Sequence, residues 1–257
     1  MSYENKYLFC IIEEPSYQTF GSMRIGNREG EVHTLSFKDL GCVMSSTSLS
    51  EPKINRKNLI AHQKVIEKVI NDYTVLPIRF GTIASSAEEV RNLLMKRYHE
   101  FKNMLRAMDN KVEMGLKVFW IDINSILTEI ANSDRKLKEL KEKLIKKKNF
   151  SLNEKIDFGE KVKEALDKKR EKEVQEIIQP LRNQNIDYVM NSIVSDSMVM
   201  NSAFLIDKRQ EPDFDDRVAG LSDKYKDRYQ FKYIGPSPPY NFVNLYIRWG
   251  GMKEERN

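Results

Sequence analysis

Two short segments rich in proline and glycine constrain the fold more than any other feature of this chain. Residues 75–82 (VLPIRFGT) have the pattern of a short apolar strand that contains Pro77 and is closed by Gly81. Residues 235–243 (GPSPPYNFV) have the pattern of an aromatic, proline-dense strand exit. Proline fixes the backbone φ angle and cannot donate to a sheet ladder, so both segments predict stiff corners at a sheet edge or a bulge. Neither has the spacing of a catalytic motif.

The length and composition predict a globular chain with two domains. The chain has 257 residues, of which 40% are hydrophobic and 32% charged, as is typical of ordered globular proteins. The formal charge of +5 comes from residues 134–173, which hold 15 Lys and Arg against 10 Asp and Glu. We therefore expect a solvated helical segment of mixed charge there, and no basic surface for a polyanion.

We expect a cytoplasmic protein that does not insert into a membrane. No signal-peptide pattern opens the sequence. The longest apolar run, residues 7–12, is far shorter than the ~20 residues that a membrane-spanning helix needs.

Apolar periodicity and turn residues predict an N-terminal α+β domain over residues 1–121. Apolar residues that recur every three or four positions, Leu59 and His62 among them, predict a helix at 55–73 that packs on a sheet. The capping-box spacing of Ser86 and Glu89 predicts a second, long helix that ends near Asn110. The expected order is βββαβαβ, an α+β sandwich with helices over one face of the sheet. The expected strands are 6–13, 32–37, 40–44, 74–79 and 112–121.

Residues 122–185 are expected to form a charged helical connector, and residues 186–257 a second α+β domain with a tail. In the connector, helices at 122–148 and 153–176 are predicted to form an antiparallel hairpin whose second helix packs on the C-terminal domain. With that helix, the order of the second domain is αββαβ, which predicts a modified ferredoxin-like fold that lacks or replaces its first strand. The expected elements are strands at 186–195, 198–206 and 229–234 and a helix at 211–225.

The sequence offers no cofactor, metal or catalytic site. His33, His62 and His99 have none of the neighbours that zinc motifs require. Cys10 and Cys42 lie in apolar, strand-like runs and are expected to be small core residues, although a disulfide between neighbouring strands is conceivable. We therefore expect no enzyme, no cofactor, no metal and no small-molecule substrate.

Five segments of the sequence carry a resemblance to a known family. They are VLPIRFGT and GPSPPYNFV, the AHQKVIEKV helix from Ala61, the MGLKVFW strand from Met114 and the AFLID strand from Ala203. Together they resemble the gas vesicle protein F/L family, over residues 7 to 243. The resemblance implies two α+β domains, the second a modified ferredoxin-like fold. It also implies a non-enzymatic accessory or minor structural protein that is needed to assemble gas vesicles and associates with the small hydrophobic shell protein and with other accessory proteins. Whether the chain acts as an F-type or an L-type member stays open.

Six residues in the two corners and the tail are candidates for binding a partner. Arg79 could pair with an acidic residue of a partner, or it could hold a carboxylate within its own sheet while Phe80 fills the core. The apolar tail from Tyr240 to Trp249 could cover a partner or fold back onto its own domains. The candidates are Arg79, Phe80, Tyr240, Phe242, Tyr246 and Trp249.

Two other classes of function were weighed against a protein-binding role. The alternative is an RNA-binding ferredoxin-like module, because such sheets often present aromatic side chains to bases. The sequence lacks the RNP-type motif, in which aromatic residues and glycine alternate on an RNA-binding sheet, so no nucleic-acid partner is expected. An enzyme with an unrecognised site would need a deep polar pocket with clustered titratable groups.

Overall fold

The chain folds into two compact α+β units. The computed structural model describes residues 4–25, 28–133, 137–139, 151–182, 186–247 and 249. The first unit comprises Met1–Glu113 together with Pro236–Asn257, and the second comprises Met114–Gly235. The expected boundaries at 121 and 185 therefore differ from the observed ones, because the strand after residue 113 pairs within the second unit and the tail returns to the first.

Unit 1 is built on a sheet whose central strand is completely buried. Among the described residues this sheet has six strands in the order β2-β3-β4-β1-β5, with β6 also paired to β1. Residues 7 to 12 of β1 are all buried, so both faces of the strand are covered. The strands are β1 (Asn5–Glu13), β2 (Thr19–Ile25), β3 (Arg28–Phe37), β4 (Leu40–Thr47), β5 (Leu76–Pro77) and β6 (Ile83–Ala84).

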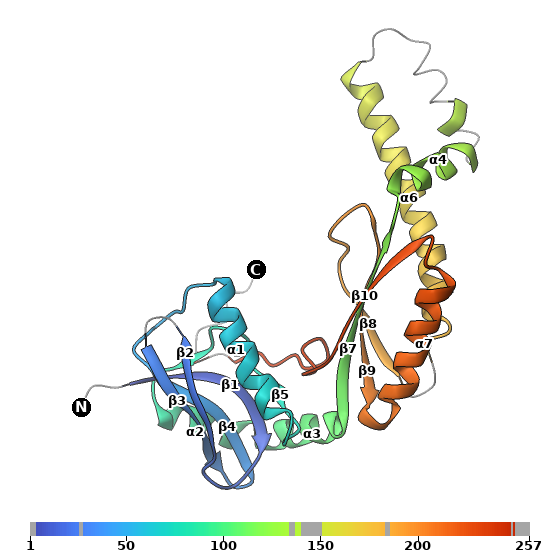
Figure 1. Ribbon diagram of the computed structural model, residues 1–257. Helices are drawn as coiled ribbons and strands as arrows, with labels where there is room; N and C mark the ends of the chain where they lie inside the picture. The colour runs from blue at the N-terminus through green and yellow to red at the C-terminus, as the bar shows by residue number, and fades with distance from the viewer. Residues whose placement is uncertain are drawn as a thin grey trace. The chain divides into compact units, whose positions relative to one another are not determined.

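Helices cover both faces of this sheet, which corrects the expectation of helices over one face only. On one face, Tyr7, Phe9 and Ile12 of β1 pack with the helix α1 (Arg56–Val69). On the other, Leu8 and Ile11 pack with α2 (Ala87–Lys96) and α3 (Tyr98–Met108) (Figure 1). The unbroken apolar run of β1 has this cause, since a strand with one exposed face would alternate apolar and polar residues.

Local details of unit 1 also differ from the expectation. The strand β2 and the short β6 were not expected, and the strand expected at 74–79 is reduced to β5, because Pro77 has no N–H to extend the ladder. The helix expected from Ser86 to Asn110 is two helices that meet at Arg97, whose backbone leaves the helical region with φ −108° and ψ 20°. Cys10 and Cys42 are buried free thiols that belong to the cores on opposite faces of the sheet.

Unit 2 has the strand order of a ferredoxin-like fold with its first strand present. Its four strands run β10-β7-β9-β8 among the described residues, so in order of appearance the fourth strand lies beside the first, then the third and the second. The strand β7, expected to close the first domain, therefore takes the place that seemed empty in the second. The elements are β7 (Lys111–Trp120), α4 (Ile123–Ser133), α6 (Leu152–Ile178), β8 (Asp187–Met190), β9 (Met198–Asp207), the short 3-10 helix η1 (Lys208–Gln210), α7 (Glu211–Lys224) and β10 (Tyr229–Ser237).

The charged helices belong to unit 2. The long α6 packs on β9 and α4, and the capping box of Ser151 and Glu154 begins it. Residues 140–150, which hold the end of the helix expected at 122–148 and the start of the turn expected at 149–152, lie outside the described residues. In the part of the chain that the structure describes, no helix has both the length and the apolarity to cross a bilayer.

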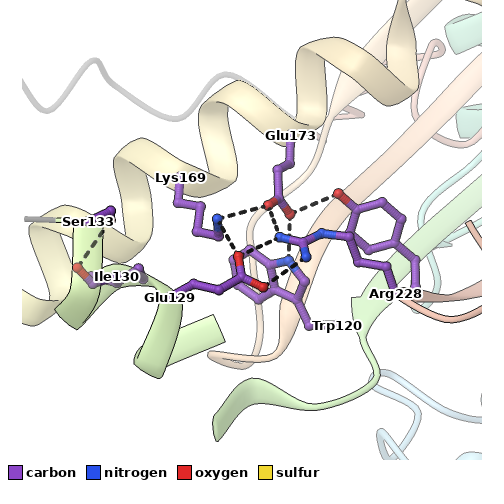
Figure 2. A network of polar contacts seen from close by, with 8 residues as sticks. Trp120, Glu129, Ile130, Ser133, Lys169, Glu173 and Arg228 are labelled. Atoms are coloured by element: carbon purple, nitrogen blue, oxygen red, sulfur yellow. Dashed lines mark hydrogen bonds and ion pairs between the residues drawn. The ribbon is translucent and has the colours of Figure 1, made fainter. Parts of the chain in front are cut away.

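A buried carboxylate attaches α6 to the sheet of unit 2. Glu173 on α6 accepts hydrogen bonds from Trp120 Nε1 (2.6 Å), Tyr229 Oη (2.8 Å) and Arg228 Nη2 (2.5 Å) (Figure 2). Burial alone would raise the pKa of Glu173, but these donors outweigh it and lower the pKa. The carboxylate is therefore charged and fully engaged in the core.

The same cluster attaches α4. Arg228 makes a two-pronged contact with Glu129 on α4 (3.0 and 3.1 Å), and Lys169 on α6 lies 2.8 Å from Glu129 (Figure 2). Hydrogen bonds from Arg228 and Lys169 lower the pKa of Glu129 to about 2. Two carboxylates thus face two cations, so each charge of this partly buried cluster has an opposite charge beside it.

Removal of the buried charge should destabilise unit 2. We expect Glu173→Gln to lower the free energy of unfolding by about 2 kcal/mol, because Arg228 loses one of its two carboxylates in a half-buried site. Denaturant unfolding followed by circular dichroism measures it. The matched control is Glu164→Gln on the exposed face of α6, where an ion pair with Lys168 is worth less than about 1 kcal/mol. Equal losses in the two variants would contradict the role assigned to Glu173.

Candidate functional site: a groove between the two corners

The two proline-containing corners, far apart in the sequence, meet in unit 1 around one open groove. The corner at 75–82 contributes Pro77, Ile78, Arg79 and Phe80, and the tail contributes Tyr240 and residues 243–246. The helix α1 supplies the remaining wall, and the cavity has a volume of about 630 Å³. The lining residues are Leu59, His62, Gln63, Pro77, Ile78, Arg79, Phe80, Tyr240, Val243, Asn244, Leu245 and Tyr246.

A buried tyrosine and histidine hold the first corner from beneath. The hydroxyl of Tyr7 on β1 lies 2.9 Å from His62 Nδ1 and accepts a hydrogen bond from the backbone N–H of Gly81 (3.2 Å). On the other side of the ring, His62 Nε2 lies 3.1 Å from the carbonyl oxygen of Ile78. Because a carbonyl only accepts, His62 donates from Nε2 and accepts the Tyr7 proton at Nδ1.

This network requires neutral side chains and a glycine. Burial raises the pKa of the Tyr7 hydroxyl and lowers the pKa of His62 to about 4, so both groups are uncharged near neutral pH. Gly81 has a φ of +88°, a conformation that side chains with a Cβ rarely adopt. The ring of Phe80 packs edge-on against Tyr7 and His62, with centroids 6.2 and 5.7 Å apart.

A second buried carboxylate holds the other corner. Glu113, which is 5% exposed, accepts from the backbone N–H and the side-chain amide of Asn241 (2.7 and 2.6 Å), and its carbonyl accepts from Ser237 Oγ (3.0 Å). Burial raises the pKa of Glu113, and the Asn241 donors oppose that rise. The tail that follows places Val243 and Leu245 in the apolar core beside α2 and α3. The tail therefore folds back onto its own unit through these two residues.

Four of the six candidate residues come together at the groove. Arg79 lies with its Cζ 5.4 Å from the ring centre of Tyr246, and Phe80 and Tyr240 line the same cavity. Phe242 is half-buried and does not line it. Trp249 lies apart, in a second hollow of about 440 Å³ beside Leu93 and Arg97, where it packs against the apolar core.

Sequence reasoning missed the contribution of α1. Leu59 was expected on the inward stripe with His62, but it is 42% exposed and lines the groove. The buried stripe of α1 instead comprises Asn58, Ala61, His62, Val65, Ile66 and Val69. The sequence did contain a signal, because Leu59 and Ile60 together broaden the apolar stripe beyond what one face of a helix can bury.

The groove has the chemistry of a binding surface. His62 is the sole histidine in the lining, and its two nitrogens are both occupied by structural hydrogen bonds. Among the described residues, no group of three or more His, Cys, Asp or Glu side chains could hold a metal ion. The groove presents apolar and aromatic surface together with the exposed polar side chains of Gln63 and Asn244 and one guanidinium, an arrangement suited to holding a partner segment.

Loss of the Tyr7 hydroxyl should destabilise unit 1. We expect Tyr7→Phe to lower the free energy of unfolding by about 1–3 kcal/mol, because His62 Nδ1 and the Gly81 N–H lose their partner in a buried place. Denaturant unfolding measures the change. The control is Tyr17→Phe, which removes a hydroxyl from a 62% exposed side chain and should have little effect. A negligible cost for Tyr7→Phe would show that the network does not support the corner.

The neutral His62 should make stability depend on pH. The folded pKa of His62 is about 4 against an ordinary value of 6.5, so the unfolded chain binds more protons between these values. Stability is then fully present above pH 6.5 and falls as the pH drops to 4, by roughly 3 kcal/mol at most. Denaturant unfolding across this range should give a shallower slope for His62→Gln than for the unaltered chain. Identical slopes would contradict burial of a neutral histidine.

Comparisons with known proteins place this architecture in one family. The family model described as gas vesicle synthesis protein GvpL/GvpF matches residues 5–244. Gas vesicle protein F of Microcystis aeruginosa (strain PCC 7806) is 26% identical over 93% of this chain and 98% of its own length, and gas vesicle protein F1 of Halobacterium salinarum is 23% identical over 95% of both. The crystal structure of GvpF from Microcystis aeruginosa has a TM-score of 0.77 with 26% identity, over 94% of this chain and 99% of that one. The match covers nearly the whole chain, including both corners, and this chain therefore belongs to the GvpL/GvpF family of gas vesicle synthesis proteins.

Proposed function

We propose that this protein acts in gas vesicle assembly as a non-catalytic binding partner of the small shell protein and of other accessory proteins. Its place of action is the cytoplasm, in association with gas vesicles. Membership of the GvpL/GvpF family supports the gas vesicle role. The observation that carries the binding role is the groove, where both corners that characterise the sequence present apolar and aromatic side chains to solvent.

A physical need explains such a partner. A shell subunit with a strongly apolar face would aggregate before it enters the shell, so a protein that covers this face keeps it available for assembly. The groove offers matching surface, since Leu59, Tyr240 and Tyr246 are 42%, 38% and 63% exposed at its rim. Exposed aromatic side chains around a buried apolar floor are typical of the centre of a protein interface.

Side chains, and not the sheet edge, provide this mode of binding. The strand at the groove, β5, is two residues long, and Pro77 has no N–H to offer to an added strand. Pairing of backbones at this edge is therefore limited. A partner would be held by pockets and aromatic faces, in the manner of a segment laid into a groove.

Co-expression with the shell protein tests the proposal. We expect the tagged chain to recover the shell protein, and the double variant Leu59→Asp with Tyr246→Ala to recover at least about tenfold less, because both changes remove apolar contacts from the rim. The control is Ile54→Asp, at an 81% exposed apolar residue of the same unit that does not line the groove.

The pull-down is interpretable when the variants are folded and when recovery is compared with that of an unrelated protein. Circular dichroism and thermal unfolding should be unchanged in both variants. Recovery of shell protein by the unaltered chain at the level of an unrelated ferredoxin-like protein would refute the proposed function. Equal recovery by the groove variant and by the control would exclude the groove as the binding surface.

A further inference from the structure

We propose that the groove binds an apolar segment of a gas vesicle protein that carries a carboxylate, and that Arg79 pairs with this carboxylate. The inference rests on the proposed function, because it takes the partner to be a gas vesicle protein. It goes further in assigning the chemistry of the bound segment. Apolar side chains would fill the floor, and an acidic group would lie at the Arg79 rim.

The charge of the groove comes from Arg79. His62 is neutral because burial lowers its pKa to about 4, and burial likewise raises the pKa of Tyr240, which stays an uncharged phenol. The other lining residues are apolar or uncharged polar side chains. Arg79 is therefore the charged residue of the lining, among apolar and uncharged polar side chains, and Glu67 on α1 lies next to the groove, where it accepts a hydrogen bond from Gln63 (2.7 Å). An acidic group of a partner is the electrostatic complement of Arg79.

Arg79 is exposed and has its guanidinium free for such a pair. None of the ion pairs formed within the described residues involves Arg79, whose Cζ instead lies 5.4 Å from the ring centre of Tyr246. By contrast Arg97, which faces the second hollow, is engaged by Glu100 and also donates to the carbonyl of Tyr246 (2.8 Å). Arg97 thus fixes the backbone that carries the Tyr246 ring, and the ring in turn orients Arg79.

The contact of Arg79 with the Tyr246 ring leaves the guanidinium available for a carboxylate. A guanidinium on an aromatic face keeps its N–H edges free, and those edges match a carboxylate with two parallel hydrogen bonds. When an apolar segment covers the rim it excludes water, so the pair gains strength relative to an exposed ion pair.

The size of the groove sets the length of the bound segment. A volume of about 630 Å³ lies within the ~300–1,000 Å³ of pockets that take ligands and short anchors. It has room for a few large side chains. The floor of Pro77, Ile78, Val243 and Leu245 is apolar, so those side chains should be aliphatic or aromatic.

Photo-crosslinking of the full chain identifies the segment. The probe is the variant Leu59→p-benzoylphenylalanine, co-expressed with the shell protein and the other gas vesicle proteins, and the crosslinked peptide is identified by mass spectrometry. We expect a segment with large apolar residues and an Asp, a Glu or a chain terminus within about one helical turn of the crosslink, roughly 5 Å. The control position is Ile54, which does not line the groove. A crosslinked segment without a carboxylate overturns the inference.

Charge reversal tests the pairing itself. Arg79→Glu should lower recovery of the partner at least tenfold, Arg79→Lys should retain part of it, and Lys in place of the mapped carboxylate should restore binding to Arg79→Glu. Arg182→Glu is the matched control, because Arg182 is also exposed and lies 5.4 Å from the ring of Tyr188, in the other unit. It should leave recovery unchanged.

The outcomes separate the inference from the proposed function. Undiminished recovery by Arg79→Glu overturns the inference and leaves the shell-binding role intact. An equal loss in Arg79→Glu and Arg182→Glu also overturns it, because a general effect of charge would then explain the result. Failure of the unaltered chain to recover any gas vesicle protein overturns both.

Discussion

The burial of β1 on both faces is the constraint on which the first unit depends. Six consecutive side chains, residues 7 to 12, must all find apolar surroundings, and they divide between the two faces of the sheet, with a bulge between Leu8 and Cys10 that interrupts strict alternation. One set therefore requires α1 and the other requires α2, α3 and the returning tail. The polar atom in this run, the Tyr7 hydroxyl, cannot stay unpaired, and its two hydrogen bonds place the first corner against α1. The groove is a consequence of this core.

Both units use a buried carboxylate to fix a segment that apolar packing alone would leave less well defined. In unit 2, Glu173 and Glu129 face Lys169 and Arg228, so the charge within the cluster is balanced. In unit 1, Glu113 is met by the backbone and the side-chain amide of Asn241, and no ion pair to it is formed within the part of the chain that the structure describes. Burial accordingly raises the pKa of Glu113, whereas the cations lower the pKa of Glu129. The first arrangement fixes helices, and the second fixes the corner that forms one wall of the groove.

The sequence predicted the α+β class and most long elements, because their periodicity is strong. The unbroken apolar run at 7–12 is typical of a strand whose two faces are both buried. We nevertheless expected helices over one face of the sheet only. Other features had weak local signals. The strand β2 contains Gly21 and several polar residues, so its sequence does not have the pattern of a strand. The break between α2 and α3 at Arg97 contains no proline or glycine, the residues that usually mark the end of a helix. The strand β7 was recognised but assigned to the wrong side of a boundary, because only sheet pairing decides where it belongs.

The sequence predicted several residues of the groove, but it did not predict that they lie together. Arg79, Phe80, Tyr240 and Tyr246 were candidates because proline corners with aromatic residues are stiff and exposed. Their convergence depends on contacts across more than 150 positions of the chain, which no local pattern encodes. Leu59 was missed because periodicity assigns a residue to a stripe without saying how wide a stripe the sheet can cover. The roles of Tyr7 and His62 needed the atomic distances.

The discontinuity of unit 1 has a consequence for synthesis on the ribosome. All residues from Met114 to Gly235 are translated before the segment that supplies Tyr240, Val243, Leu245 and Tyr246 to the groove. A nascent chain therefore exposes the α1 side of the groove without its opposite wall, and a product that stops before Tyr240 never acquires it. Formation of the complete groove therefore requires that translation has passed through the residues of both units.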